Sequence, residues 1–311
     1  MKRSVRPRIA IIGTGKLARA LAPLLADRGY RIAAIAGRRP GAARSLCRAL
    51  RGASPTTVPE RAAASAELIL LAVPDREIES LALRLSRAEG LTWKGKTVLH
   101  HAGALGLEPL RPLERSGAAV GVLHPLQALG DPAVVREVLP GSRARLEGTP
   151  KALAEARRLA RDLELVPLRM KRKMTARERV AYHAAASLAS NDLLSLLGLA
   201  VDLMQSAGLG RRAAVEALAP LARGTLTQAE RRGLGASLTG PVVRGDAETV
   251  AAHLAELERR SPRDATLHRL LSERLLELAQ REGHSLSAAD RRRLSRLLAR
   301  PSGGRGGGPT V

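Results

Sequence analysis

The chain has 311 residues, which suggests two domains of about 150 residues each. Its single cysteine excludes an intrachain disulfide and a multi-cysteine metal site, and no spacing of its histidines resembles a zinc-ligand set, so we expect no metal. The 52 lysines and arginines outnumber the 29 acidic residues, giving a formal net charge of +23, but only 1% of the residues are aromatic. This scarcity argues against the stacking platforms that bind single-stranded nucleic acids.

The first half of the chain alternates short apolar runs with helical patterns. The runs that predict strands cover residues 9–12, 31–36, 68–73, 97–100 and 118–123, and helical spacing is clearest at 17–25 and 77–85. Continuous apolar strands that alternate with helices predict a doubly wound parallel sheet covered on both faces. A further βαβ-like element or hairpin is predicted within 144–170, with 163–168 as its strand.

The second half has no β-branched runs and follows helical patterns throughout. Helices are predicted at 174–207, 211–221, 246–259, 262–281 and 288–300. The sequence therefore predicts an α/β domain over residues 1–172, an all-helical C-terminal domain over 173–300, and a disordered Gly-rich tail over 301–311.

The clearest motif is Ile-Ala-Ile-Ile-Gly-Thr-Gly-Lys-Leu-Ala at 9–18, which follows the first strand and opens the first helix. Gly13 permits the tight turn, Gly15 lets the backbone approach a pyrophosphate, and Ala18 stands where a third glycine is common. The helix amides favour phosphate. The motif predicts a Rossmann-like domain with a dinucleotide held by Gly13, Thr14, Gly15, Lys16 and Leu17; the alternative is a glycine turn that binds nothing.

The end of the second strand bears on the choice of cofactor. An NAD site usually places a carboxylate there for the ribose hydroxyl, whereas this chain has Arg38 and Arg39. Two guanidinium groups can hold a 2′-phosphate, which favours NADP over NAD; the alternative is two solvated arginines. At the end of the third predicted strand, Val73, Pro74 and Asp75 are expected to border the cofactor.

Histidines follow the next two strands, in His100-His101-Ala102-Gly103 and in Leu123-His124-Pro125. Carboxyl ends of parallel strands meet at one edge, so these imidazoles could line a common cleft. The alternative for each is hydrogen-bonded packing.

In the helical half, His183, Ser187 and Asn191 are spaced i, i+4, i+8 on one predicted helix face and form a candidate cleft wall, or a face packed on polar loops. Further on, Leu238-Thr239-Gly240-Pro241 leads to Arg244-Gly245-Asp246, where Asp246 can N-cap a helix and Arg244 offers a fork for a carboxylate.

Together these motifs resemble the Rossmann-like proteins whose C-terminal half is called domain of unknown function 2520. The resemblance covers about residues 7–300 and is carried by the Gly13 turn, the Val73-Pro74-Asp75 stretch and the histidine-containing loops, together with the helical segments around residues 182–191 and 238–246. The usual form near residue 101 looks like His-Ser-Gly, and here Ala102 replaces the serine. If that hydroxyl touches substrate in the family, this chain has lost it.

The family is similar to pyrroline-5-carboxylate reductases, coenzyme-F420-dependent NADP reductases and ketopantoate reductases. The resemblance implies an NADP domain joined to a helical domain that often dimerises. Ketopantoate reductases use a helical-domain lysine with an asparagine one turn on, and this chain has no lysine after Lys173. His183 would have to replace that lysine, or Lys171 or Lys173 would have to reach the site.

The leading hypothesis is a cytoplasmic NADP-dependent oxidoreductase acting on a small carbonyl or imine substrate that carries a carboxylate, with a ketopantoate-like substrate as one option. His183 is the predicted proton donor, His124 a second candidate, and Asn191 would orient the substrate or polarise its oxygen. The remaining predicted substrate contacts are Thr239, Arg244, Ser187 and His101.

The alternative hypothesis is a non-catalytic NADP(H)-binding sensor or regulatory module. In either case we expect a homodimer formed through the helical domain, and neither a nucleic-acid nor a membrane partner, since no uninterrupted apolar run reaches the roughly 18 residues of a membrane helix.

Overall fold

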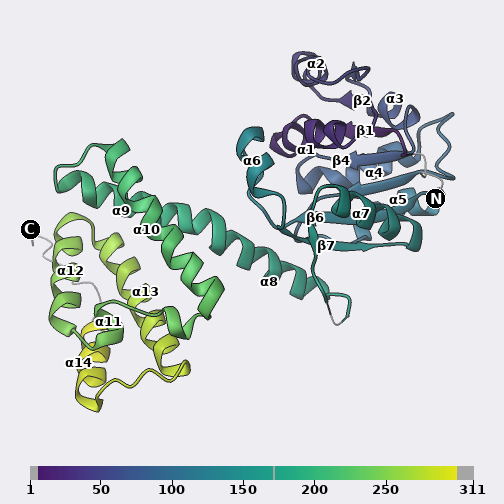
Figure 1. The fold of residues 1–311 in the computed structure, drawn as a ribbon. Helices are drawn as coiled ribbons and strands as arrows, with labels where there is room; N and C mark the ends of the chain where they lie inside the picture. The colour runs from purple at the N-terminus through teal and green to yellow at the C-terminus, as the bar shows by residue number, and fades with distance from the viewer. Residues whose placement is uncertain (1–5, 171, 300–311) are drawn as a thin grey trace, which may run out of the picture. The chain divides into compact units, whose positions relative to one another are not determined.

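The computed structural model describes residues 6–170 and 172–299, which form two compact units divided between Asn191 and Asp192 (Figure 1). The predicted tail at 301–311 lies outside the described residues. The last helix of the first unit, α8 (Ala176–Ser187), contacts the sheet domain through side chains described below. The domain boundary predicted at 172–173 stays a prediction.

An eight-stranded sheet forms the centre of the first unit, with strand order β3-β2-β1-β4-β5-β6-β7-β8. Strands β1 to β6 pair in parallel, β7 runs antiparallel to β6, and β8 is parallel to β7. The strands are β1 (Ile9–Ile12), β2 (Ile32–Ala36), β3 (Ser54–Thr56), β4 (Leu68–Leu71), β5 (Thr97–His100), β6 (Ala119–Pro125), β7 (Arg143–Gly148) and β8 (Val166–Pro167).

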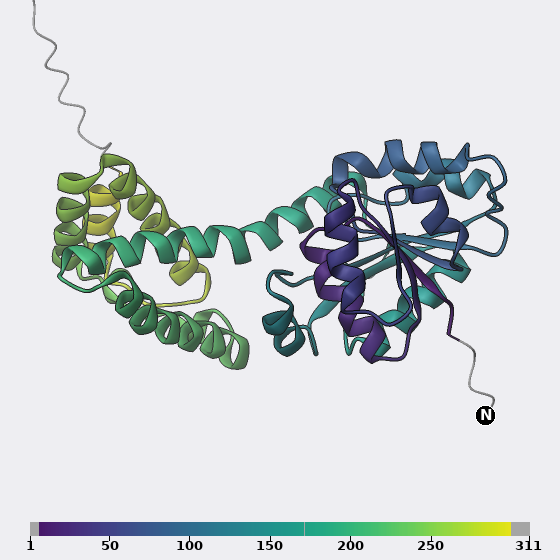
Figure 2. The ribbon, with the colours of Figure 1, turned by 90° about the horizontal axis from the view of Figure 1, so that it is seen from above.

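Helices cover both faces of this sheet (Figures 1 and 2). Those of the first unit before α8 are α1 (Lys16–Asp27), α2 (Pro40–Arg48), α3 (Pro59–Ala64), α4 (Ile78–Ser86), α5 (Arg111–Arg115), α6 (Pro132–Val138) and α7 (Pro150–Asp162), with short 3₁₀ turns at Asp75–Glu77 and Glu108–Leu110.

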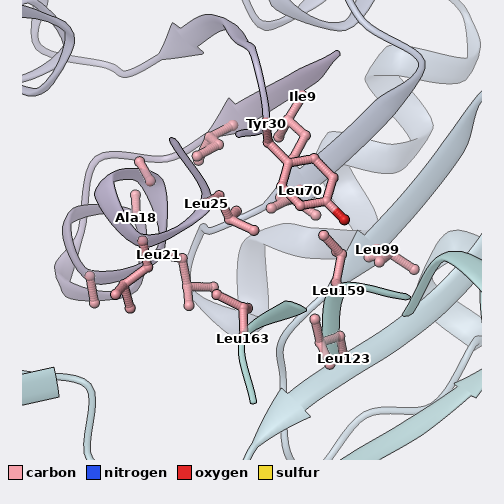
Figure 3. Close-up of a cluster of buried hydrophobic side chains, with 14 of the residues drawn as sticks. Ile9, Ala18, Leu21, Leu25, Tyr30, Leu70, Leu99, Leu123, Leu159 and Leu163 are labelled. Atoms are coloured by element: carbon pink, nitrogen blue, oxygen red, sulfur yellow. The ribbon is translucent and has the colours of Figure 1, made fainter. Parts of the chain in front are cut away.

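Alternation along the strands builds two separate cores. Ile9 and Ile11 face the cluster that includes α1 and α7, whereas Ala10 and Ile12 face the cluster that includes α3, α4 and α5. Figure 3 shows the first cluster, where aliphatic side chains surround the single ring of Tyr30. The Tyr30 hydroxyl donates to the Asp162 carboxylate at 2.8 Å, which satisfies the one polar atom of this ring.

The five strands predicted in the first half all form, within one or two residues of the predicted ends. Strand β3 was missed because Ser54-Pro55-Thr56 carries no apolar run; a proline is tolerated there since β3 is an edge strand. The element predicted within 144–170 consists of β7, α7 and β8.

The second unit is helical, as predicted. It contains α9 (Leu193–Ser206), α10 (Arg211–Arg232), α11 (Pro241–Arg244), α12 (Ala247–Arg260), α13 (Pro262–Arg281) and α14 (Ala288–Leu298), with a 3₁₀ turn at Gly235–Ser237. Its core is small and lies between α11, α12, α13 and α14. Helix α10 continues past the predicted end at residue 221, with Pro220 inside it.

The helix predicted over 174–207 is interrupted. A π-helical turn at Leu188–Asp192 separates α8 from α9, and such turns often occur at functional positions. Among the described residues, the segment Ala176–Ser206 is long and apolar enough to cross a membrane, with a mean hydropathy of 1.5 and 6% of its apolar window buried. A single segment of this kind is weak evidence for a membrane span.

Candidate dinucleotide and catalytic site

The glycine turn after β1 has the geometry that a bound pyrophosphate requires. Gly13 has φ +123°, and a Cβ there would lie 2.0 Å from the carbonyl oxygen of Ala72 at the end of β4. Gly15 is the N-cap of α1 with ordinary extended backbone, and a Cβ there would meet no atom within 4 Å. Gly13 is thus needed by the fold itself, whereas the space in front of Gly15 is open to a ligand.

The electrostatics of the same turn favour binding of an anion. The first turn of α1 contains no acidic residue and its first residue is Lys16, so no side chain of that turn offsets the partial positive charge of the helix terminus. Thr14 packs on Gly37 at the end of β2: a Cβ on Gly37 would lie 2.5 Å from Cγ2 of Thr14. This contact connects the turn to the next predicted cofactor residues. Leu17 packs against the first core cluster.

Both predicted 2′-phosphate ligands are exposed at the carboxyl end of β2. Arg38 forms an ion pair with Glu77 at 3.3 Å, with 85% of the arginine side chain exposed. Arg39 precedes α2 as its N-cap residue. An exposed pair of this kind is worth at most about 1 kcal/mol, so a phosphate can compete with Glu77 for Arg38.

Two predicted catalytic histidines come together around Gly103. A Cβ on this glycine would lie 2.6 Å from Cδ2 of His183 and 2.9 Å from Nε2 of His124. Nδ1 of His124 is hydrogen-bonded to the hydroxyl of Tyr182 at 2.9 Å, and the two rings meet edge to face. Helix α8 therefore delivers His183 and Tyr182 to the carboxyl edge of β5 and β6.

Asp75 lies near this group. Burial raises the pKa of Asp75, and the opposing influence comes from the charge of His183. Val73 and Pro74 connect Asp75 to the end of β4, where the amide of Val73 would lie 3.1 Å from a Cβ on Gly13. The cofactor turn and the histidine pair thus share one edge of the sheet.

Burial sets the charge state of three histidines at this edge. Burial lowers the pKa of His124 to about 4, helped by the positive charges of Arg145 and His183. Burial lowers the pKa of His100 to about 4 and that of His101 to about 3. We call His100, His101 and His124 the edge histidines. All three are neutral at pH 7, whereas His183 is exposed.

Arg145 on β7, which the sequence motifs did not reveal, holds the loop between these histidines. Its side chain is 2% exposed, and it donates to the carbonyls of Ala102 at 3.0 Å and Leu105 at 2.6 Å and to Glu147 at 2.9 Å. The i, i+2 spacing of Arg145 and Glu147 on one strand face was the available signal. The charge of this buried guanidinium contributes to the lowered pKa of His124.

A second missed pair connects α8 with the 3₁₀ turn at Glu108–Leu110. Arg179 donates to the Glu108 carboxylate at 2.9 Å and to the carbonyl of Met174, and its side chain is 7% exposed. Gly106 leaves the room for this pair, because a Cβ there would lie 2.4 Å from Oε2 of Glu108. The capping box of Thr175 and Glu178 starts the helix one turn earlier.

The other predicted site residues make no direct contact with the His124–His183 pair that the hydrogen bonds of the described residues would show. Asn191 lies in the π turn and its amide donates to Ser187 at 3.5 Å, so these two remain neighbours despite the interruption. Thr239 and Arg244 belong to the second unit and are both exposed; Thr239 lies just before α11, and Arg244 is its last residue. Asp246 N-caps α12 as predicted, accepting from the amide of Thr249 at 3.0 Å.

Ala102, which stands where the family usually has a serine, is 4% exposed and belongs to the apolar cluster of Ile12 and Ile69. The loss of a substrate contact at this position stays a prediction. Among the described residues, no three His, Cys, Asp or Glu side chains gather closely enough to hold a metal ion.

Comparison with known proteins identifies the two halves. Residues 2–125 match the model of a Rossmann-like domain, and residues 143–275 match the domain of unknown function DUF2520. No curated protein matches the chain.

Solved structures share the fold over most of the chain. A candidate NADP oxidoreductase from Bacteroides fragilis is 24% identical with a TM-score of 0.71, over 88% of this chain and 98% of that one. A 1-pyrroline-5-carboxylate reductase from Streptococcus pyogenes is 15% identical with a TM-score of 0.60, over 89% and 100%. An imine reductase from Streptomyces aurantiacus is 17% identical with a TM-score of 0.56, over 94% and 100%.

Proposed function

The chain belongs to the proteins that join a Rossmann-like domain to a domain of unknown function 2520, and we propose that it is an oxidoreductase that uses a nicotinamide dinucleotide, with NADP preferred. The observation that carries the proposal is the open turn at Gly15 beside the His124–His183 pair at one sheet edge. The names of the structural neighbours support the same class of reaction.

The residues present fit such a cofactor. Thr14, Gly15 and Lys16 would hold the pyrophosphate, and Arg38 and Arg39 the 2′-phosphate. When bound, the cofactor supplies or accepts a hydride. The protein must then bind the substrate, orient it and move a proton.

His183 is the proposed proton donor or acceptor. It is exposed at the edge of the sheet, whereas burial and Arg145 keep His124 neutral at pH 7. A neutral His124, held by Tyr182, can position or polarise a substrate oxygen or nitrogen, but it is not an imidazolium that could act as a general acid. Asn191 and Ser187 would extend the polar wall beyond His183.

The proposed substrate is a small carbonyl or imine compound that bears a carboxylate, of which a ketopantoate-like acid is one example. The exposed guanidinium of Arg244 supports an anionic substrate, because it offers a fork for a carboxylate. Thr239 and Arg244 stay as proposed contacts to it.

A second copy of the chain is the proposed partner. Helices α9 and α10 are 14 and 22 residues long, yet each buries a single residue, Val201 and Ala214. Leu194 and Leu221 are 69% and 67% exposed. Large apolar side chains left this open on two neighbouring helices mark an interaction surface. We expect cytoplasmic localisation, with this surface covered by the second copy and not by lipid.

Cofactor binding can be tested directly by titrating the protein with NADPH and NADH while following nicotinamide fluorescence. We expect both to bind and NADPH to bind more tightly. Arg38→Ala and Arg39→Ala should weaken NADPH and leave NADH unchanged, and Arg48→Ala at the far end of α2 is the matched control. If neither nucleotide binds, the proposal is wrong. Binding without oxidation across a panel of keto acids and imines would favour a sensor.

A further inference from the structure

Two adjacent histidines at the end of β5 have opposite hydrogen-bonding states. His100 is fully satisfied within its own loop: Nδ1 accepts from the amide of Ala102 at 3.1 Å, and Nε2 donates to the carbonyl of Gly106 at 2.7 Å. The role of His100 is therefore to shape the loop 100–106.

His101 is only half satisfied. Its Nδ1 lies 2.6 Å from the carbonyl oxygen of Leu123, and its Nε2 is buried with no hydrogen-bond partner among the described residues. A carbonyl can only accept, so Nδ1 carries the proton. The ring is neutral because of its burial, which leaves a bare lone pair on Nε2. Nε2 is thus an acceptor that lacks a donor.

Buried polar atoms without partners are rare, and each calls for an explanation. The side chain of His101 is 8% exposed, so bulk water does not reach it freely. The side chain of Arg145 is committed elsewhere, because it donates to the carbonyls of Ala102 and Leu105 and to Glu147. The donor for Nε2 must therefore come from outside this set of side chains.

The order of the strands indicates which part of a dinucleotide lies here. Arg38 follows β2, the Gly13–Gly15 turn follows β1, and His101 follows β5, in the sheet order β2-β1-β4-β5. With the 2′-phosphate at β2 and the pyrophosphate at β1, the nicotinamide end extends over β4 and β5. The amide of its carboxamide is the hydrogen-bond donor of that ring.

We propose that Nε2 of His101 accepts a hydrogen bond from the carboxamide N–H of the nicotinamide ring. His101 is then a cofactor-positioning residue that fixes the orientation of the ring against His124 and His183. The inference rests on the proposed function, because it requires a nicotinamide dinucleotide at this edge.

The test pairs a protein variant with a cofactor analogue. His101→Asn keeps an amide N–H to donate to Leu123 but has no atom where Nε2 stands. In the acetylpyridine analogue of NADPH, a methyl group replaces the carboxamide nitrogen, so the donor is lost. Dissociation constants for both nucleotides are measured by fluorescence with wild type, with His101→Asn and with His100→Asn as the neighbouring control.

We expect His101→Asn to bind NADPH on the order of tenfold more weakly than wild type, the usual effect of one hydrogen bond. The variant should not discriminate between NADPH and the analogue, whereas wild type and His100→Asn should. Equal binding of NADPH by wild type and His101→Asn would overturn the inference and leave the proposed function intact. Absence of NADPH binding to wild type would overturn both.

A measurement on the wild-type protein covers the case in which the variant does not fold. The ¹⁵N resonance of His101 Nε2 reports the bond directly, since an unprotonated ring nitrogen shifts when it accepts a hydrogen bond. NADPH should move this resonance, and the acetylpyridine analogue should move it less. The same shift with both nucleotides would contradict the inference.

Discussion

The two glycines of the first turn provide the sharpest test of the cofactor site, because the structure assigns them different tasks. We expect Gly15→Ala to fold normally and to lose cofactor affinity, and Gly13→Ala to lose stability. Gly13 needs its positive φ and its contact with Ala72, whereas Gly15 needs only the empty space in front of it.

The expected free energies follow from the geometry. At Gly15, alanine is a poorer N-cap by about 0.5–1 kcal/mol, and the reduced entropy of the unfolded chain offsets this by about 0.4–1 kcal/mol. The change in unfolding free energy should therefore be near zero. At Gly13, the backbone strain costs about 1–3 kcal/mol, and the overlap with the Ala72 carbonyl oxygen adds about 1–3 kcal/mol.

The effect on binding is separate. A methyl group at Gly15 would push a phosphate away from the amides of α1, and each charged hydrogen bond lost costs about 1.5–3 kcal/mol. The dissociation constant for NADPH should rise about ten- to hundredfold.

Two assays distinguish the outcomes. Urea unfolding followed by circular dichroism measures stability, and nicotinamide fluorescence measures affinity for NADPH. If Gly15→Ala bound NADPH as wild type does, the phosphate would not lie at this turn. If Gly15→Ala lost as much stability as Gly13→Ala, the conclusion that a Cβ on Gly15 meets only open space would be wrong.

Three further predictions concern the histidines and the exposed helices. Gly103→Ala should displace the imidazoles of His124 and His183 and lower kcat more than it weakens NADPH binding, which steady-state kinetics and fluorescence would separate; an unchanged kcat would contradict their role. The free energy of unfolding should fall below pH 6.5, because the edge histidines are protonated there in the unfolded chain, whereas in the folded chain their pKa values are about 4 and about 3. Each edge histidine should lower the free energy of unfolding by about 1.4 kcal/mol per pH unit in this range. Urea midpoints that stay constant from pH 7 to pH 5 would refute this prediction. Leu221→Asp removes a 67% exposed leucine from α10 and should convert a dimer into monomers, as measured by the molar mass from light scattering. The control Leu83→Asp on α4 should leave the molar mass unchanged. A monomeric wild-type protein would refute the proposed surface.

Local patterns were enough to predict the parallel sheet and the dinucleotide turn. Continuous apolar runs such as 9–12 and 97–100 have few alternatives to buried strands, and a glycine pair between such a strand and a helix has a strong geometric meaning. Strand β3 and the π turn at Leu188–Asp192 were not predicted, because an edge strand needs little hydrophobicity and a π turn inserts one residue into a pattern that still looks helical.

The candidate catalytic group depended more on tertiary structure. Spacing indicated that His101 and His124 end neighbouring strands and that His183 lies on a helix, but only the folded chain brings His124 and His183 together beside Gly103. Arg145 and Arg179 were not predicted as site residues. The i, i+2 spacing of Arg145 and Glu147 is a weak signal, and one arginine among so many stands out only once its burial is known.

The sequence by itself thus determined the order of strands and helices and the position of the cofactor turn, because these follow from periodicity and from the conformational freedom of glycine. Tertiary structure alone decided which polar groups lose their water, and burial sets both the charge state of an imidazole and the need of its nitrogen for a partner. That is why His100 and His101, identical and adjacent in the sequence, differ in the folded protein: one is satisfied within its loop, and the other retains a free lone pair.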